Sequence, residues 1–449
     1  MIRSKEKPPT ARSGALFLLE QSEKSQEDLS ALIDRYLKRR LLERRDRALL
    51  TELVYGVWRQ RGFLDWRIDQ FSKVPSLQPT LRNILRLALY QIFFLDKIPP
   101  SAAVNESVEL AKQTGGIAAG RLANGLLRNI LRQKDRLPQP DPTGDPVIFI
   151  SVGASHPEWL VRRWIARWGE EKTLQLCRSN NETPPTTLRT NTLKISRAEL
   201  ARRLEDEGAS AALSPLSSEG LYLKRGAVGT LPSYQQGLFY IQDEGAQLIS
   251  YLVDPRPGET LLDLCAAPGG KSTHLVELMK GKGEVVATDI DPERLNLIEE
   301  NVRRLQTPGV SVEPLPDAAA PQRRYDRILI DAPCSALGIL RRIPEGKWKK
   351  RPSIIPAYAK KQRELLEKGA PLLKKGGRLI YATCSTEPEE NEEVVENFTL
   401  NHPEFKIEHP AESLPPAARK YVDEKGYFTT LFNSDKMDQF FGVRWVRKS

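Results

Sequence analysis

The stretch LLDLCAAPGGKSTHL, residues 261–275, joins a short apolar run, a turn of small residues and a helical pattern. A β-strand that passes through such a turn directly into a helix is typical of an open parallel sheet, whose ligands bind beyond the carboxyl ends of the strands. Small residues at 266–270 let a ligand approach the backbone closely, beside a helix N-terminus. The stretch therefore predicts an α/β domain with a ligand site at the turn.

Outward from this stretch, further apolar β runs alternate with helical patterns. The runs EVVATD (284–289), YDRILID (325–331) and GRLIYATC (377–384) lack polar alternation, as expected of strands that are covered on both faces. We therefore expect residues 233–449 to form a Rossmann-like domain built on a doubly wound, mostly parallel sheet.

The chain before this domain begins with a helical region. Residues 1–135 carry apolar side chains at three- and four-residue spacing in six segments, which are separated by breaks rich in proline or glycine. This pattern predicts an all-α domain of about six helices. Four prolines in RLPQPDPTGDP (136–146) indicate a linker, which we place at 136–152.

Residues 153–232 show a mixed pattern. A helical pattern with three tryptophans opens the region, and packing in a core is the favoured role for those side chains. Strand patterns follow at 186–192 and 220–224, and Ser196 with Glu199 forms a capping box for a helix between them. A small α/β module that binds RNA is expected here.

Composition restricts the class of protein. Hydrophobic residues make up 40% and charged residues 28%, which is typical of a globular protein, and no apolar run reaches membrane-spanning or signal length. The four cysteines lack CxxC spacing, so we expect free thiols in the cytoplasm, no metal site and no membrane segment.

An excess of positive charge favours a nucleic-acid partner. The formal net charge is +10, and the segment RRIPEGKWKKR (341–351) holds six cations against one acid. Its proline, glycine and tryptophan indicate a loop that contacts RNA backbone and bases. Arg341, Arg342 and Lys347 are therefore predicted RNA contacts.

The small-residue turn at 265–271 has two interpretations. It does not match GxGxxG, the motif of dinucleotide sites, and it does not match a Walker loop, the motif of nucleoside triphosphate sites. A nucleoside cofactor is therefore favoured. Asp289 ends the next strand, where an acid suits the two hydroxyls of a ribose. The alternatives are a tight turn without a ligand and a capping role for Asp289 at the helix near Pro292.

Two cysteines follow the ends of two strands. Cys334 comes shortly after Asp331, and Cys384 ends the next strand, so both should open on the same crevice as the cofactor turn. Carbon 5 of cytosine is a poor nucleophile, but a thiolate that adds at carbon 6 creates an enamine able to attack an electrophilic methyl group. One cysteine would be the nucleophile and the other would assist release, with Asp331 holding ring nitrogen 3.

The surroundings of Cys384 predict opposing effects on its thiol. Thr386 with Glu389 predicts a capping box, whose helix N-terminus would favour the thiolate, whereas Glu387, Glu389 and Glu390 would oppose it. Two buried, unreactive thiols are the alternative reading. Amino methylation is disfavoured because DAPC does not match an (N/D)PPY-like loop, and a non-catalytic RNA-binding assembly factor is the remaining alternative.

The chain as a whole resembles the RsmB (Sun/Fmu) family of bacterial small-subunit rRNA cytosine-5 methyltransferases. Within residues 46–131, the segments DRALLTELVYGV and RLANGLLRNILR resemble a NusB-like RNA-binding domain. The segments CAAPGGK, DAPCSALGILRR and ATCS resemble the methyltransferase motifs of the family, and IQDEGAQL (241–248) resembles the segment before the cofactor strand.

The resemblance implies roles for individual residues. Cys384 would be the nucleophile, Cys334 the releasing cysteine, and 16S rRNA, before or during subunit assembly, the substrate of an enzyme expected to be a monomer. S-adenosyl-L-methionine would bind through Cys265, Ala266, Ala267, Pro268, Gly269, Gly270, Lys271, Asp289, Asp317 and Asp331.

Two segments depart from the pattern of the family. The acid near the adenine usually stands in GDG or GDA, whereas here Asp317 stands in LPDAAA. The usual DGFF near the C-terminus is DQFF at 438–441.

Overall fold

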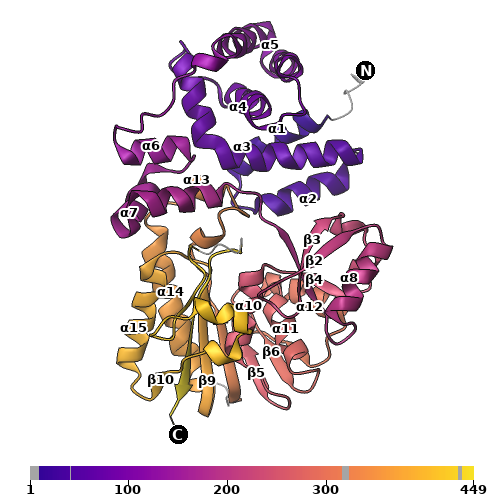
Figure 1. Ribbon diagram of the computed structural model, residues 1–449, viewed down its shortest axis with the longest axis vertical. Helices are drawn as coiled ribbons and strands as arrows, with labels where there is room; N and C mark the ends of the chain where they lie inside the picture. The colour runs from indigo at the N-terminus through magenta and orange to yellow at the C-terminus, as the bar shows by residue number, and fades with distance from the viewer. Residues whose placement is uncertain (1–9, 41, 316–322, 433–436, 449) are drawn as a thin grey trace. The chain divides into compact units, whose positions relative to one another are not determined.

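The computed structural model describes residues 10–40, 42–315, 323–432 and 437–448 (Figure 1). The chain divides into two compact units. The first comprises Met1–Glu182 and Leu340–Lys350, and the second comprises Thr183–Ile339 and Arg351–Ser449. In the part of the chain that is described, no helix is long and apolar enough to cross a membrane.

The first unit is helical, as predicted. Its apolar faces meet in one core that includes Trp58, Leu85 and Leu127. The last two predicted helices form one element that bends at Gly116, where φ is 78° and ψ is −176°. The elements are α1 (Ala11–Lys24), α2 (Leu29–Arg39), α3 (Arg44–Phe71), α4 (Pro79–Phe94) and α5 (Pro100–Arg132).

Two further helices belong to this unit. α6 (Pro146–Gly153) occupies the end of the predicted linker, and α7 (Glu158–Asn180) lies in the region assigned to the middle module. Both carry apolar residues that require burial. Trp164 is 1% exposed and its ring centroid lies 5.9 Å from that of His156, so this tryptophan is a packing residue.

A segment from the C-terminal half of the chain also completes this helical unit. It contains α13 (Gly346–Lys349). Trp348 packs against the helical core, and its Nε1 donates a hydrogen bond to the carbonyl of Trp58 at 2.9 Å. The backbone N–H of Leu29 donates to Glu345 at 3.2 Å. The segment is therefore a buried structural part of the unit.

The second unit begins with a small antiparallel sheet in the order β2-β3-β1-β4. The capping box of Ser196 and Glu199 forms as predicted and opens α8 (Arg197–Asp206). The sheet includes β4, so it extends past the expected limit at residue 232. Its strands are β1 (Thr186–Thr190), β2 (Ser210–Leu213), β3 (Gly220–Arg225) and β4 (Phe239–Ile241), with the short α9 (Pro232–Gln235) before β4.

The larger sheet has the order β10-β12-β9-β8-β5-β6-β7, and its central strands are parallel. This arrangement confirms the predicted doubly wound, mostly parallel sheet. The parallel strands are β5 (Thr260–Asp263), β6 (Glu284–Ala287), β7 (Val310–Val312), β8 (Tyr325–Asp331) and β9 (Leu373–Thr383). Antiparallel pairing adds β10 (Phe405–Ile407), β11 (Phe428–Thr429) and β12 (Phe441–Arg447).

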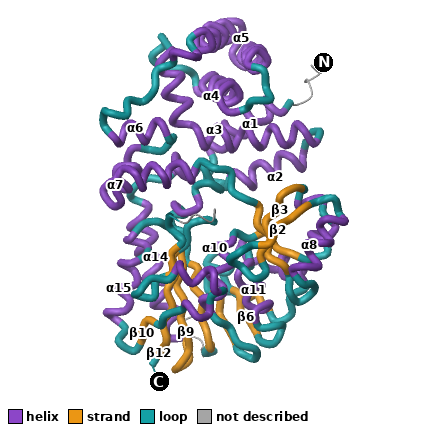
Figure 2. The backbone as a smooth tube through the Cα atoms, in the orientation of Figure 1, coloured by secondary structure: helices purple, strands orange, loops and turns teal. Residues whose placement is uncertain are grey.

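Helices cover this sheet (Figure 2). The apolar residues divide between a cluster that includes Ala359 of α14 and a cluster that includes Leu248 of α10. Because both faces of the sheet are buried, the absence of polar alternation in its strands is explained. The helices are α10 (Glu244–Val253), α11 (Gly270–Leu278), α12 (Leu295–Leu305), α14 (Ile354–Gly369) and α15 (Glu392–Asn401).

A buried ion pair joins the two sheets of the second unit. Arg189 of β1 and Glu277 of α11 are fully buried, and two guanidinium nitrogens donate to the two carboxylate oxygens at 2.9 and 3.0 Å. Arg189 also donates to Gln242 at 2.6 Å, to Thr273 at 2.9 Å and to the carbonyl of Gly270. One side chain therefore fixes the first turn of α11 against the small module.

Removal of one member of this pair should be costly, because it leaves a buried charge without compensation. We expect Arg189→Met to lower the free energy of unfolding by about 3–5 kcal/mol. The double variant Arg189→Met/Glu277→Met should recover much of the loss, since it removes the stranded carboxylate. Urea denaturation monitored by tryptophan fluorescence measures both, and a single variant as stable as the parent would contradict the assignment.

Candidate active site

The turn between β5 and α11 surrounds a small pocket of about 200 Å³. Gly269 has a φ of 94°, and a Cβ there would lie 3.0 Å from Ile298. A Cβ on Gly270 would lie 2.7 Å from the ring of Tyr240. The two glycines therefore allow the turn to pack closely against Ile298 of α12 and Tyr240 of β4.

Most of the predicted cofactor residues meet at this pocket. Gly269 and Asp289 are outside its lining, and Asp317 lies outside the described residues. The predicted residues that line the pocket are Cys265, Ala266, Ala267, Pro268, Gly270, Lys271 and Asp331.

Asp289 supports the turn from its outer side. Its carboxylate accepts hydrogen bonds from the backbone N–H groups of Ala267 and Asp291, each at 3.0 Å. The helical turn at Pro292 is capped by Asp291, whose side chain accepts from the N–H of Glu293. The alternative capping role of Asp289 is therefore wrong.

Asp263 is a pocket residue that the sequence analysis missed. It is fully buried, and one carboxylate oxygen accepts a hydrogen bond from Ser272 at 2.7 Å. Its other oxygen, Oδ1, has no hydrogen-bond partner among the described residues. Burial raises the pKa of Asp263 to about 7. An unsatisfied buried acceptor beside a pocket is a place for an N–H donor of a ligand.

Side chains of the small module complete the pocket. Tyr240, Ile241 and Gln242 line it, and they come from β4 and the residue after it. The only local signal for Asp263 is an acid inside the apolar run LLDLC. No local signal marks the β4 residues, because their place depends on how two sheets pack.

The two predicted cysteines lie together. Cys334 follows β8 and Cys384 follows β9, and their sulfur atoms are 3.3 Å apart in a hydrogen bond. The backbone N–H of Gly338 donates to the carbonyl of Cys384 at 2.9 Å. Neighbouring parallel strands thus present two thiols at one edge of the sheet, as the sequence predicted for the crevice.

A buried carboxylate holds the two cysteine loops in place. Glu390 accepts hydrogen bonds from the backbone N–H of Ser335 at 2.7 Å, from the Ser385 hydroxyl at 2.5 Å and from Gln362 at 3.1 Å. The Ser335 hydroxyl also donates to Glu390 and lies 3.0 Å from the Ser385 hydroxyl. Each serine directly follows one of the cysteines, so Glu390 sets the distance between the thiols.

The predicted capping box of Thr386 and Glu389 is wrong. Residues Pro388–Glu390 form a short 3-10 turn, and α15 begins at Glu392 with Asn391 as its N-cap. A helix N-terminus therefore does not lie directly after Cys384. The local acids were expected to oppose a thiolate, but Glu390 serves as an acceptor for serines and a backbone N–H.

Charge near the thiols comes from Lys271 and Asp331, which form an ion pair at 2.5 Å. Burial alone would lower the pKa of Lys271, but the charge of Asp331 and its hydrogen bond outweigh burial and raise it. Lys271 therefore remains a cation, and its charge interacts with Cys384. The hydrogen bond with Cys384, together with burial, raises the pKa of Cys334 well above its usual value.

Comparison with known proteins gives a consistent result. Models described as 16S rRNA methyltransferase RsmB/F, the NusB family and an RsmF/B-like ferredoxin-like domain match residues 250–444, 9–132 and 156–228. A probable ribosomal RNA small subunit methyltransferase B from Bacillus subtilis is 38% identical over 422 residues, which are 93% of this chain and 94% of the relative. The chain belongs to the RsmB/F family of 16S rRNA methyltransferases.

Other relatives and solved structures agree with this membership. The ribosomal RNA small subunit methyltransferase B of Cronobacter sakazakii is 36% identical over 90% of this chain and 91% of the relative. The crystal structure of PH0851 is 28% identical, with a TM-score of 0.79 over 99% of this chain and 100% of that one. A methyltransferase homolog protein from Pyrococcus horikoshii is also 28% identical, with a TM-score of 0.56 over 68% of this chain and 100% of that one. The predicted family and fold class are confirmed.

Within this RsmB/F family member, the predicted RNA contact Lys347 is wrong. Its side chain is fully buried, and its Nζ donates to the carbonyls of Arg59 at 2.8 Å and Ser155 at 3.0 Å and to Asn181 at 2.8 Å. Burial lowers its pKa to about 7. Arg341 is 4% exposed and has little surface for RNA, whereas Arg342 is half-buried and stays a prediction. The tryptophan and proline of the segment indicated a loop, but the loop packs inward.

The departure at 438–441 has a structural basis. Gln439 stands at the usual glycine position, and its backbone N–H donates to the carbonyl of Gly338 at 3.0 Å. The described non-glycine residues with positive φ do not include Gln439, so no left-handed conformation demands glycine here. DQFF therefore preserves the contact between this segment and the loop that follows Cys334.

Glu390 should act as a positioning residue. We expect Glu390→Ala to lower kcat for methylation by more than about 10-fold, with little change in KM for the cofactor, because the buried serine and backbone donors lose their acceptor. Glu390→Gln should recover part of the rate, since one acceptor oxygen remains.

Glu393→Ala is the matched control, because it removes an exposed acid at the start of α15. Steady-state methylation kinetics measure all three variants. Equal rates for Glu390→Ala and Glu393→Ala would contradict the positioning role.

Proposed function

We propose that this chain transfers a methyl group from S-adenosyl-L-methionine to carbon 5 of a cytosine in 16S rRNA, through a covalent adduct with Cys384. The observation that carries the proposal is the pair of thiols 3.3 Å apart at the ends of β8 and β9, beside the pocket at the turn. Family membership supplies the substrate class, 16S rRNA, and methyl transfer. The pair of thiols supports the choice of carbon 5.

The pocket suits the proposed cofactor. Asp263 offers a buried acceptor without a partner for the amino group, and Gly270 lines the pocket where α11 begins. When bound, S-adenosyl-L-methionine supplies the electrophilic methyl group. Cys265, Ala266 and Ala267 line the pocket beside these groups.

The chemistry then rests on the two cysteines. The Cys384 thiolate adds to carbon 6 of cytosine, which forms a C–S bond and turns carbon 5 into a nucleophile for the methyl group. Lys271, whose charge interacts with Cys384, is the cation near this sulfur. The sulfur of Cys334, as a thiolate, then accepts the carbon 5 proton; the electron pair of that C–H bond restores the 5,6 double bond, and the C–S bond breaks to leave Cys384 as a thiolate.

Asp331 is the candidate contact for the base. One of its oxygens pairs with Lys271, and its side chain is 27% exposed at the pocket. Among the described residues no hydrogen bond reaches the other oxygen, so it can hold protonated ring nitrogen 3, which draws electrons from carbon 6 and eases addition of the thiolate. A single-stranded or looped target is expected, because the base must leave its stack to reach the thiols.

Trapping of the adduct tests the proposal. Cys334→Ala protein, incubated with 16S rRNA and S-adenosyl-L-methionine, should give a slow band on a denaturing gel that RNase collapses and that disappears when Cys384 is also replaced. Cys384→Ala alone should abolish methylation while cofactor binding stays near that of the parent.

Three results would count against the proposal. Continued methylation by Cys384→Ala would exclude the covalent role of this thiol. Methylation by Cys334→Ala without a trapped band would remove Cys334 from release. No methylation of any RNA by the parent would favour the non-catalytic assembly factor.

The pKa of Asp263 predicts pH-dependent cofactor binding. A folded-state pKa of about 7 means that Asp263 is largely protonated below that pH and ionised above it. The cationic amino group of the cofactor prefers the carboxylate, so affinity should rise roughly fivefold to 10-fold between about pH 6 and pH 8.

Isothermal titration with S-adenosylhomocysteine measures this rise. Asp263→Asn should bind more weakly at pH 8 and show a flat profile, since the amide does not titrate. A parent profile without a rise would show that Asp263 does not hold the amino group.

A further inference from the structure

The thiols of Cys334 and Cys384 are close enough for a disulfide to form between them. Both cysteines are half-buried, and their sulfur atoms lie 3.3 Å apart. A disulfide holds its sulfur atoms about 2.05 Å apart, so the two atoms need to approach by little more than about 1 Å. The strands that carry them, β8 and β9, pair directly. Paired strands lie about 4.8 Å apart, within the Cα separation of about 4.4–6.8 Å that disulfides span.

A buried carboxylate keeps the two cysteine loops at this separation. Glu390 accepts hydrogen bonds from the N–H of Ser335 at 2.7 Å and from the hydroxyl of Ser385 at 2.5 Å. Gln362 donates to Glu390 at 3.1 Å and to the carbonyl of Pro333 at 3.0 Å. These contacts fix the backbone on either side of the thiols, so rotation of the two cysteine side chains can bring the sulfur atoms together.

The other two cysteines are protected from oxidation. Cys177 of α7 is fully buried, and Cys265 is 9% exposed. Burial raises the pKa of Cys177 to about 12 and the pKa of Cys265 well above its usual value, so both thiols stay protonated. Peroxides react with the thiolate form of accessible cysteines. Oxidation should therefore begin at the half-buried pair.

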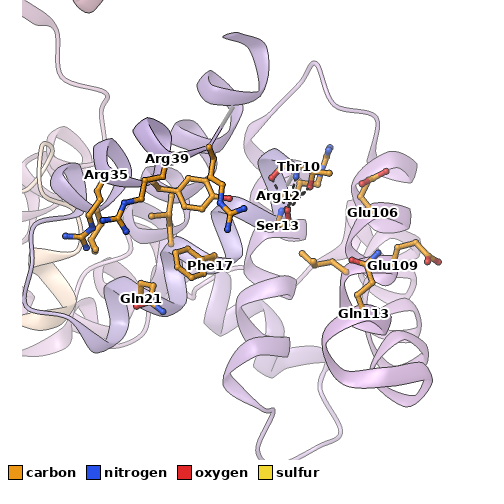
Figure 3. A pocket seen from close by; sticks show the side chains of 15 residues that line it. Thr10, Arg12, Ser13, Phe17, Gln21, Arg35, Arg39, Glu106, Glu109 and Gln113 are labelled. Carbon is orange, nitrogen blue, oxygen red and sulfur yellow. Dashed lines mark hydrogen bonds between the residues drawn. The ribbon is translucent and has the colours of Figure 1, made fainter. Parts of the chain in front are cut away.

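The wide groove on the first unit offers no competing site. It has a volume of about 980 Å³, and most of its lining comes from α1, α2 and α5 (Figure 3). None of the residues that line it contains sulfur. The thioethers of Met279 and Met437 are buried as well. The pair of thiols is therefore the sulfur chemistry that a peroxide meets first.

The surroundings of the two thiols assign their order of reaction. The hydrogen bond with Cys384, together with burial, raises the pKa of Cys334 well above its usual value, so Cys334 keeps its proton. Cys384 is therefore the sulfur that reacts with the oxidant. Once Cys384 carries an oxygen atom, it no longer holds the negative charge that raised the pKa of its neighbour, and Cys334 can lose its proton.

We propose that hydrogen peroxide converts Cys334 and Cys384 into a reversible disulfide. The Cys384 thiolate attacks one peroxide oxygen, and the O–O bond breaks to give a sulfenic acid and one water molecule after protonation. The Cys334 thiolate then attacks the sulfenic sulfur, which forms the S–S bond and releases the second water molecule. The two thiols lose two electrons and two protons in total, and the peroxide gains both.

This chemistry gives Cys334 a second function as the resolving thiol. A sulfenic acid without a neighbouring thiol proceeds to the sulfinic acid, which dithiols do not reduce, whereas a dithiol reverses a disulfide by exchange. Because part of each sulfur-bearing side chain is exposed, a dithiol can reach the bond. The loss of methylation on oxidation rests on the proposed function, since the disulfide occupies the nucleophile. Formation of the disulfide does not.

Peptide mass spectrometry on the full chain tests the proposal. The protein is treated with a small molar excess of hydrogen peroxide, its remaining thiols are alkylated, and it is digested with trypsin without reductant. We expect the peptides 328–341 and 379–406 to appear linked, with a mass lower by two hydrogen atoms than their sum. Methylation should fall in proportion to the linked fraction, and dithiothreitol should restore both the free peptides and the activity.

Two variants test the role of the resolving thiol. In Cys334→Ala, peroxide should add two oxygen atoms to peptide 379–406, and dithiothreitol should not remove them. Cys177→Ala is the matched control, because it removes a thiol remote in sequence and fully buried, and it should form the linked peptides as the parent does. Circular dichroism checks that both variants fold.

The outcomes separate this proposal from the proposed function. Sulfinic acid at Cys384 in the parent without linked peptides, while the reduced protein methylates 16S rRNA, would overturn the disulfide alone. A linked protein that still methylates would overturn the switch and count against the covalent role of Cys384. Reversible linkage in a parent that methylates no RNA would support the disulfide and count against the proposed function.

Discussion

The parallel pairing of β8 with β9 is the constraint on which the active site depends. Asp331 pairs in register with Ala382, and the N–H of Ala332 donates to the carbonyl of Ala382 at 2.8 Å. The carboxyl ends of parallel strands lie at the same edge of a sheet, so the residues that follow two neighbouring strands lie close together. The 3.3 Å separation of the two sulfur atoms follows from that register and from the buried carboxylate of Glu390 that joins the two loops.

The pocket beside the thiols depends on a second set of contacts, which come from the small module. Arg189 holds the first turn of α11, and Tyr240 packs on Gly270. The module is therefore part of the candidate cofactor pocket as well as a predicted RNA-binding element. This explains why the second unit contains both sheets, with the small one supplying a wall that the larger sheet lacks.

Chain continuity links the loop after Cys334 to the helical unit. Gly338 bonds to Cys384, and two residues later the chain enters the segment Leu340–Lys350, which packs in the helical core through Trp348 and Lys347. Burial of a lysine is tolerated there because three oxygen atoms receive its three N–H donors. The composition of this basic, tryptophan-containing segment indicated RNA binding, but its Lys347 and Trp348 stabilise the helical unit.

The sequence by itself determined the helical region, the doubly wound sheet, the capping box at Ser196 and the placement of Cys334 and Cys384 at strand ends. These features follow from periodicity and local turn chemistry, which neighbouring residues encode. Tertiary structure alone decided that Lys347 is buried, that Glu390 joins the cysteine loops, and that Asp263 keeps an unpaired oxygen at the pocket. The reason is physical: whether a charged group meets water, a ligand or a buried partner depends on segments distant in the chain that pack against it.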